Sequence, residues 1–187
     1  MQVILDEQSV EQNSSTVKYG GFWVRFLAVL LDGLILAPIT FGIGYFNVIT
    51  WKSVPVLILV TLAGLAYKPV MEYLYGSTLG KMALRLQVVS ISFGKADVKA
   101  ILLRNIFNIV PGLISLIISV QIYSDPGFED ISGFQDFSMF VNQFQASQTM
   151  NFVNFALMFI DSIMLGIDEQ KRSLHDRIAG TYVIEKP

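Results

Sequence analysis

The segment from Phe22 to Val48 constrains the fold of this chain more than any other stretch. It is long and apolar enough to cross a membrane, because a crossing helix needs about 20 mostly apolar residues. It also carries Arg25 and Asp32, and a charge inside hydrocarbon costs at least about 2.5–3.5 kcal/mol. A helix places these two residues on nearly the same face, about 10 Å apart along its axis. That face therefore predicts partner helices packed against it.

Composition assigns the whole chain to the same class. Hydrophobic residues make up 53% of the 187 residues and charged residues 15%, whereas soluble domains have about 25% charged residues. The sequence has no cysteine and one histidine, which excludes disulfides and leaves little scope for a metal site. It has no dinucleotide or phosphate-loop fingerprint and no basic aromatic stretch typical of nucleic-acid binding. We therefore expect a membrane protein with no cofactor, metal or nucleic-acid partner.

Four hydrophobic segments predict four transmembrane helices. They lie at about residues 22–48, 51–75, 101–123 and 150–167. Prolines interrupt the second and third segments, where kinks are expected. A polar, acidic tail of residues 1–17, with a short ordered piece at Val3–Leu5, is expected to precede a transmembrane domain of residues 18–187.

Charge sets the expected orientation of these helices. The link between the second and third segments and the C-terminal tail each carry four lysine or arginine residues. The link at Ser124–Thr149 carries four acidic residues and no basic one. The positive-inside rule then predicts a multi-pass protein of the cytoplasmic (inner) membrane, with both termini in the cytoplasm and this link outside.

Two short elements are expected outside the spans. Leu86–Val89 and Tyr182–Ile184 are rich in β-branched residues and should pair as a ribbon on the cytoplasmic side. Phenylalanines at 134, 137, 140 and 144 recur at helical spacing, which predicts an amphipathic helix along the outer surface. A lid packed on the bundle is favoured over a docking surface for another protein. The expected fold is an all-α membrane protein, a four-transmembrane-helix bundle with a short cytoplasmic β-ribbon and an outer-surface amphipathic helix.

Several motifs together resemble a known family. They are Arg25 and Asp32, GSTLGKMALRLQVV at 76–89, LLRN at 102–105 and RSLHDRIAGTYVI at 172–184. Their order resembles the RDD family of small bacterial and archaeal membrane proteins, named for one arginine and two aspartates. The resemblance implies that Arg25 and Asp32 are the first two named residues, and that Asp161 or Asp176 is the third. The other matching residues are Gly76, Thr78, Gly80, Lys81, Arg104, His175, Gly180 and Thr181.

The resemblance implies a transporter, or a component of one, for a small cation or proton. Some members of the family are associated with sodium–proton antiport. Four spans are few for a complete pathway, so a homo-oligomer or a larger membrane complex in the lipid bilayer is expected. The alternative is a non-catalytic accessory or assembly subunit that docks through its helices and outer link. An enzyme is disfavoured because the sequence contains no nucleophile–base or metal constellation and no catalytic residue is identified.

Arg25, Asp32 and Asp161 are expected to form one polar cluster inside the bundle. A structural ion pair between Arg25 and Asp32 is favoured, and snorkelling of Arg25 to the cytoplasmic interface is the alternative. In the functional interpretation, Asp32 and Asp161 are the candidate acceptors for a proton or a small cation. If all three side chains turn inward, Asp32 is expected to stay ionised as the counter-charge of Arg25, which makes Asp161, about midway along the fourth segment, the acid expected to gain and lose a proton.

The remaining charged residues of the middle part receive simpler interpretations. Glu72 is expected to pair with Lys68 at the surface, because the two are four residues apart on a helix. Lys81 and Arg85 share a helix face, where they either hold lipid phosphates or mark the cytoplasmic side. The second interpretation is favoured.

The C-terminal motif and the glycines are interpreted structurally. His175–Asp176 resembles a metal phosphohydrolase pair, but without further histidines a short hydrogen-bonded helix at the membrane surface is favoured. Gly76, Gly80 and Gly180 are expected to serve turns and close packing.

Overall fold

Four long helices dominate the structure, a computed structural model that describes residues 17–186. The expected polar tail, including its piece at Val3–Leu5, lies outside the described residues except for Val17. The long helices have the length and apolar composition needed to cross a membrane, and they run over Phe22–Trp51, Val54–Tyr75, Ile106–Tyr123 and Gln145–Ile167. All four predicted hydrophobic segments are therefore confirmed as candidate membrane-spanning helices.

The first two long helices form a hairpin. Helix α2 (Phe22–Phe46) continues into one π-helical turn, η1 (Asn47–Trp51). Lys52 then adopts a left-handed conformation with φ 46°, and α3 (Val54–Tyr75) begins at once. Pro55 lies in the first turn of α3, where its missing N–H costs nothing. Helix α3 therefore begins three residues later than the sequence pattern predicts.

The predicted third segment is divided into two helices. Helix α5 (Val98–Arg104) ends at Asn105, and α6 (Ile106–Tyr123) follows. Arg104 and Asn105 are almost completely buried, and Asn105 Nδ2 donates back to the carbonyl of Ile101 at 2.9 Å. Polar contacts therefore fix the break, which a hydropathy pattern does not detect.

The link that follows α6 contains two short helical elements. The link contains a 3-10 turn, η2 (Pro126–Asp130), and helix α7 (Phe134–Val141). Phe144 does not belong to α7; it directly precedes α8 (Gln145–Ile167), after a turn at residues 142–143. The prediction that all four phenylalanines share one helix is therefore wrong for Phe144.

An aromatic cluster joins the link to the ends of the long helices. Phe128 is 1% exposed and stacks on Tyr123 with ring centroids 4.1 Å apart. Phe137 and Phe140 of α7 meet the same ring edge-on, and Val48 of η1 packs against the cluster. Helix α7 is therefore packed on the ends of η1 and α6.

The two predicted strands pair as expected. Strand β1 (Leu86–Ser90) runs antiparallel to β2 (Thr181–Glu185), with Val88 opposite Val183. The buried side chains of this two-stranded sheet pack against Ala28 of α2 and Ile101 of α5. Because an isolated two-stranded sheet is marginally stable, this packing on helices is what stabilises it.

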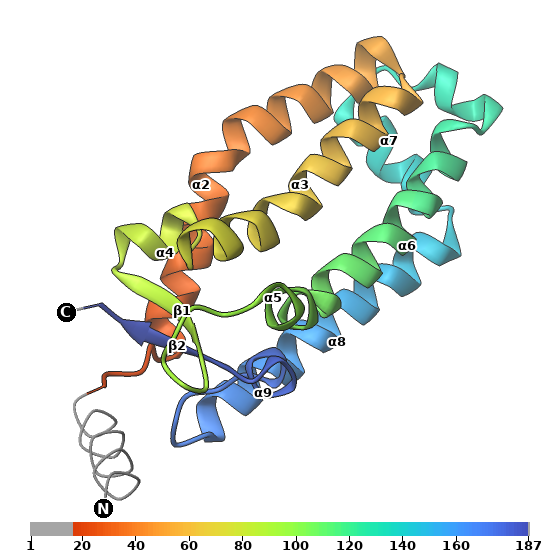
Figure 1. Cartoon of the computed structure of the whole chain (residues 1–187). Coiled ribbons are helices and arrows are strands. Elements are labelled where there is room, and N and C mark those ends of the chain that lie inside the picture. Colours follow the sequence, from red (N-terminus) through yellow and green to blue (C-terminus); the bar gives the residue numbers. More distant parts are fainter. Residues whose placement is uncertain (1–16, 187) are drawn as a thin grey trace, which may run out of the picture.

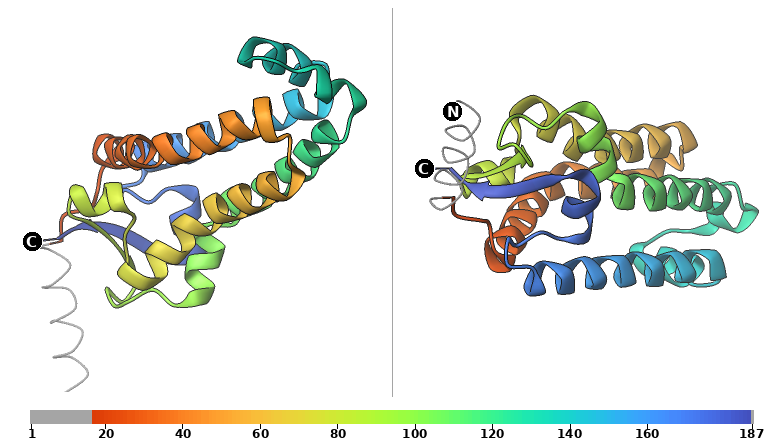
Figure 2. Two further views of the ribbon diagram at one scale, coloured as in Figure 1. Left: turned by 90° about the horizontal axis from the view of Figure 1, so that it is seen from above. Right: turned by 60° about the horizontal axis from the view of Figure 1, so that its bottom comes forward.

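The short elements gather at opposite ends of the long helices. Figures 1 and 2 show the strands with α4 (Leu79–Ala83), α5 and α9 (Leu174–Ala179) at one end, and α7 at the other. Between the ends, α3 packs on α6 and α6 on α8. Buried charged side chains are concentrated at the end that carries the strands.

Candidate functional site

Five buried charged side chains from five helices meet at the strand end of the molecule, and we call them the charged network. They are Arg25 of α2, Glu72 of α3, Lys81 of α4, Arg104 of α5 and Asp176 of α9. Each is at most 9% exposed. Burying a charge is costly unless the charge is paired. The pairing therefore requires all five helices to be in place together.

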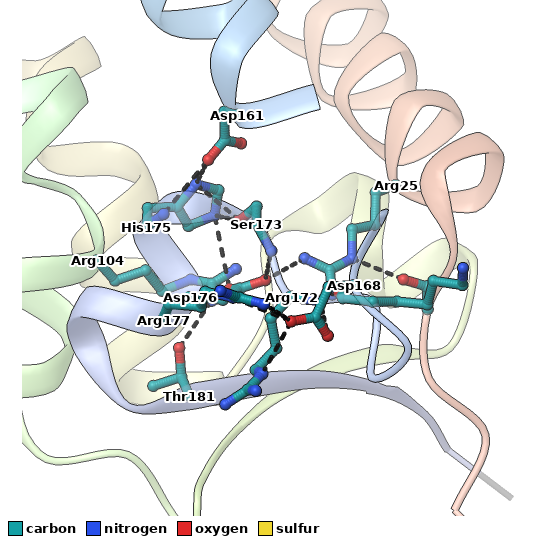
Figure 3. A network of polar contacts seen from close by, with 12 residues as sticks. Arg25, Arg104, Asp161, Asp168, Arg172, Ser173, His175, Asp176, Arg177 and Thr181 are labelled. Atoms are coloured by element: carbon teal, nitrogen blue, oxygen red, sulfur yellow. Dashed lines mark hydrogen bonds and ion pairs between the residues drawn. The ribbon is translucent and has the colours of Figure 1, made fainter. Parts of the chain in front are cut away.

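Asp176 holds one half of the charged network (Figure 3). One carboxylate oxygen accepts from Arg25 and the other from Arg104. The backbone N–H of Ser173 also donates to Asp176, at 3.1 Å, which completes a capping box at the start of α9. Burial alone raises the pKa of Asp176, but the charges of Arg104 and Arg25 outweigh it and hold the pKa well below its usual range. Asp176 is therefore ionised at neutral pH.

Arg25 ties the first span to the tail instead of to Asp32. Its Nε donates to the carbonyl of Gly20 at 2.8 Å and its Nη2 to the carbonyl of Lys171 at 2.5 Å. Side chains on a helix lean toward its N-terminus, and Asp32 lies in the opposite direction along α2. The predicted Arg25–Asp32 ion pair is therefore wrong: Asp176 binds the buried guanidinium, and Asp32 has other partners. The alternative that Arg25 reaches toward the cytoplasmic interface stays a prediction.

Glu72 holds the other half of the charged network. It accepts from the ammonium of Lys81 and, at 3.0 Å, from Nδ2 of Asn105, and Arg104 Nε lies 3.3 Å from its Oε2. Glu72 is 2% exposed, so the predicted surface pair with Lys68 is wrong. Burial lowers the pKa of Lys81 to about 8, although Glu72 offsets part of this effect. Lys81 therefore faces a buried carboxylate, not lipid phosphates.

Asp32 binds the segment that begins α4. Its carboxylate accepts from the hydroxyl of Tyr67 at 2.7 Å, the hydroxyl of Thr78 at 2.6 Å and the N–H of Gly80 at 2.7 Å. Thr78 precedes α4 but does not cap it with its own side chain. Asp32 thus supplies an acceptor to the free N–H groups of α4 from a neighbouring helix, where a negative charge is favourable.

Three motif glycines allow these close approaches. A Cβ on Gly80 would lie 2.0 Å from the carbonyl oxygen of Ala28, so α4 rests directly on α2. Gly76 ends α3 with φ 68°, and Gly180 ends α9 with φ 61°, a conformation that glycine adopts without strain. These positions agree with the predicted roles in turns and close packing.

Asp161 pairs with His175, the one histidine of the chain, and His175 Nε2 in turn lies 3.6 Å from Asp176 Oδ1 of the charged network (Figure 3). Asp161 Oδ1 lies 2.8 Å from His175 Nδ1, and the two side chains are 28% and 18% exposed. Burial lowers the pKa of His175, and the hydrogen bond with Asp161 offsets part of this shift. Because α8 begins at Gln145, Asp161 lies in the last third of its span and not midway as predicted. The expected cluster of Arg25, Asp32 and Asp161 is therefore divided between three sets of partners.

The loop after α8 holds buried polar residues that the sequence pattern does not single out. Asp168 is 5% exposed; it accepts from Nε of Arg177 at 2.9 Å and from the N–H of Gln170 at 2.8 Å. The loop holds the carbonyl of Lys171 toward Arg25. One signal was available, because Ser173 and Asp176 have the spacing of a capping box.

Residues of the C-terminal motif at 172–184 connect α5, α9 and β2 at the strand end of the molecule. Arg104 Nη1 donates to the hydroxyl of Thr181 at 3.0 Å, which connects the charged network to β2. His175 lies in the first turn of α9, close to the N-cap residue Ser173, whose hydroxyl lies 3.0 Å from His175 Nδ1. The short helix predicted at His175–Asp176 is confirmed, while its position at a membrane surface stays a prediction. Within residues 17–186, no group of three histidine or acidic side chains is arranged to hold a metal ion.

The charged network and the Asp161–His175 pair differ in the chemistry that they support. Charges of the network are paired and almost completely shielded, which suits a fixed structural tie. The Asp161–His175 pair is partly accessible, and it joins a carboxylate to the side chain whose ordinary pKa is nearest neutrality. Proton exchange is therefore the chemistry that this pair supports.

Comparison with known proteins identifies the chain's relatives. The model of the RDD family matches residues 19–180, which include both halves of the charged network, the Asp32 contacts and the Asp161–His175 pair. No curated protein and no solved structure matches the chain. The family match covers most of the sequence, and the chain belongs to the RDD family.

Proposed function

We propose that this RDD-family protein transports a proton or a small cation across the membrane, alone or as a component of a larger transporter, and is not an enzyme. The Asp161–His175 pair is the proposed proton-binding site. One observation carries the proposal: this pair joins the last third of a candidate span to a partly accessible histidine at 2.8 Å. A carboxylate and an imidazole so placed can pass a proton between a membrane helix and the adjoining solution.

The other buried acids are less suited to this role. Asp176 faces two arginines, and Glu72 faces Lys81 and Arg104. Protonating Asp176 would remove the carboxylate that pairs with Arg25, and protonating Glu72 would remove the one that pairs with Lys81, each at a cost of several kcal/mol. Asp32 accepts hydrogen bonds from Tyr67, Thr78 and Gly80, so its carboxylate already serves to hold α4 on α2 and α3. In the proposed mechanism these acids hold the helices while Asp161 exchanges the proton.

The proposed setting is the cytoplasmic membrane, with both termini and the two-stranded sheet on the cytoplasmic side. Four spans enclose little space, so the proposed active form is a homo-oligomer or part of a larger membrane complex. The loop charges and the small number of spans support these two points.

Proton flux in reconstituted liposomes tests the proposal. Asp161→Asn keeps the shape of the side chain and removes its titration, so we expect folded protein without proton-coupled flux. Ser162→Ala is the matched control, because Ser162 donates only to the carbonyl of Met158 within α8, and its flux should equal that of wild type. Normal flux in Asp161→Asn would exclude Asp161 from the mechanism.

An accessory subunit is the second candidate function. Its support is the exposed part of α7, where Phe134 is 62% and Met139 55% exposed beside the packed aromatic cluster. Apolar side chains displayed in this way suit contact with another membrane protein. Purification from native membrane in mild detergent separates the candidates. A stable complex with other proteins, combined with no flux from purified protein, would favour the accessory role.

A further inference from the structure

Two asparagines lie inside the fourth span on the same helix face as Asp161. Asn151 and Asn154 of α8 are exposed in the isolated chain. At about 100° per residue, Asn151, Asn154 and Asp161 fall within about 80° of one another, with Leu165 in the same sector. Leu165 is buried and Asp161 binds His175 of α9. We call the face that carries Asn151, Asn154 and Asp161 the polar face of α8. Near Ile167, this face packs against the rest of the chain.

A different face of α8 is suited to lipid. Phe152, Phe155 and Phe159 cluster on one side of the helix and are 72%, 60% and 55% exposed. An asparagine in contact with lipid would leave amide groups without hydrogen bonds, at a cost of a few kcal/mol. Polar residues inside spans therefore usually meet protein or a water-filled cavity. Lipid contact therefore accounts for the face with the phenylalanines but not for the face with the asparagines.

The spacing of the polar face leads from one end of the span to the Asp161–His175 pair. With a rise of about 1.5 Å per residue, Asn151 and Asn154 lie roughly 9 and 14 Å from the start of α8 at Gln145. Asp161 lies about 10 Å beyond Asn154. The exposed, flexible side chain of Met158 occupies the interval and offers no fixed charge that would repel a cation.

We propose that the polar face of α8 lines a water-filled path by which protons or small cations reach the Asp161–His175 pair from the Gln145 end of the span. This inference rests on the proposed function of that pair. Asparagine amides both donate and accept hydrogen bonds, so they can hold water where lipid chains cannot. Their carbonyl oxygens also suit hard cations.

Single-cysteine labelling tests the path without measuring transport. The native chain has no cysteine, so each introduced thiol is the single reactive site. Asn151→Cys and Asn154→Cys probe the polar face, and Phe152→Cys and Phe159→Cys, about 80° or more away around the helix, probe the lipid face. The full-length protein in liposomes is treated with a charged, membrane-impermeant thiol reagent. Thiols on the polar face should react at least about 10-fold faster, because a charged reagent avoids hydrocarbon.

Two results would overturn the path. One is equally slow labelling at all four positions, while a cysteine at exposed Ser138 in the link labels rapidly. The other is a disulfide-linked dimer formed through Asn154→Cys under mild oxidation, because a second copy would then cover this face. Asp161→Asn should leave the labelling pattern unchanged. Labelling is independent of flux, so a wild-type protein without flux would contradict the proposed function and not the water-filled face.

Discussion

Asp176 and Asp161 lie near one another but in opposite electrostatic settings. Asp176 is fully buried between Arg25 and Arg104, whereas Asp161 meets a histidine at a partly accessible position. A carboxylate between two arginines remains ionised and fixes their positions. A carboxylate paired with a histidine can share a proton with it. At the residue scale, one acid therefore serves the fold and the other is free for chemistry.

Replacing Asp176 tests its structural role. Asp176→Asn leaves the buried guanidinium of Arg25 without a carboxylate and Arg104 with Glu72 alone, and we expect a loss of about 3–5 kcal/mol in unfolding free energy. The thermal unfolding midpoint of detergent-purified protein measures the loss. Asp130→Asn, the same change at an exposed position of η2, is the matched control and should leave the midpoint nearly unchanged. Equal midpoints in the two variants would contradict the role assigned to Asp176.

The lowered pKa of His175 predicts how the stability of the folded protein depends on pH. Its folded pKa lies below the ordinary value of 6.5, so the unfolded chain binds this proton more readily. Asp161 and Asp176 favour the protonated imidazole, but burial, Arg104 and Lys68 oppose it. Its contribution to stability is therefore complete above pH 6.5 and is lost as the pH falls through the folded pKa.

Unfolding midpoints at different pH values check this sign. Wild-type protein should unfold at a lower temperature at pH 5.5 than at pH 7.5. His175→Gln removes the one imidazole of the chain and should reduce this difference. A midpoint that rises on acidification, or a difference that His175→Gln leaves intact, would contradict the direction of the shift.

At the scale of elements, helix α4 depends on its tertiary contacts, because its own sequence gives it little helical stability. It is five residues long, and short isolated helices are unstable in water. Asp32 accepts the N–H of Gly80, and Lys81 reaches Glu72. Contacts with α2 and α3 therefore hold α4 in place.

Gly80→Ala tests this docking. An added Cβ would lie 2.0 Å from the carbonyl oxygen of Ala28, so α4 must move away from α2 and weaken the Asp32 contacts. We expect a loss of at least about 1–3 kcal/mol, the usual cost of overpacking. Gly64→Ala in α3 is the control, since nothing lies within 4 Å of its added Cβ. Comparable unfolding midpoints for the two variants would argue against direct packing of α4 on α2.

The elements differ in how far the sequence predicts them. Long apolar runs and β-branched runs carry their own local signal, so the four helices and the two strands are confirmed. The partners of Asp32 carry no such signal, because Thr78 and Gly80 reach it only after α3 and α4 have turned back. Helix periodicity correctly predicts that Arg25 and Asp32 share a face, but side-chain direction separates them. Sequence pattern thus predicts the elements better than the contacts between them.

At the scale of the whole molecule, the two ends of the long helices are chemically different. One end carries the charged network and the two-stranded sheet, and the other carries the aromatic cluster around Phe128. Basic residues of the middle link and tail lie on elements of the first end, and the acidic link forms the second. This asymmetry supports an orientation with the strand end in the cytoplasm.

Labelling of one cysteine at each end tests this orientation. Ser92 follows β1 at the strand end and Ser138 lies in α7, and both are exposed. A membrane-impermeant reagent added to intact cells should label Ser138→Cys at once and Ser92→Cys only after the membrane is permeabilised. The native chain has no cysteine and serves as the unlabelled control. Labelling of Ser92→Cys alone in intact cells would reverse the orientation, and labelling of both would overturn the four-span topology, because the two ends must face opposite sides.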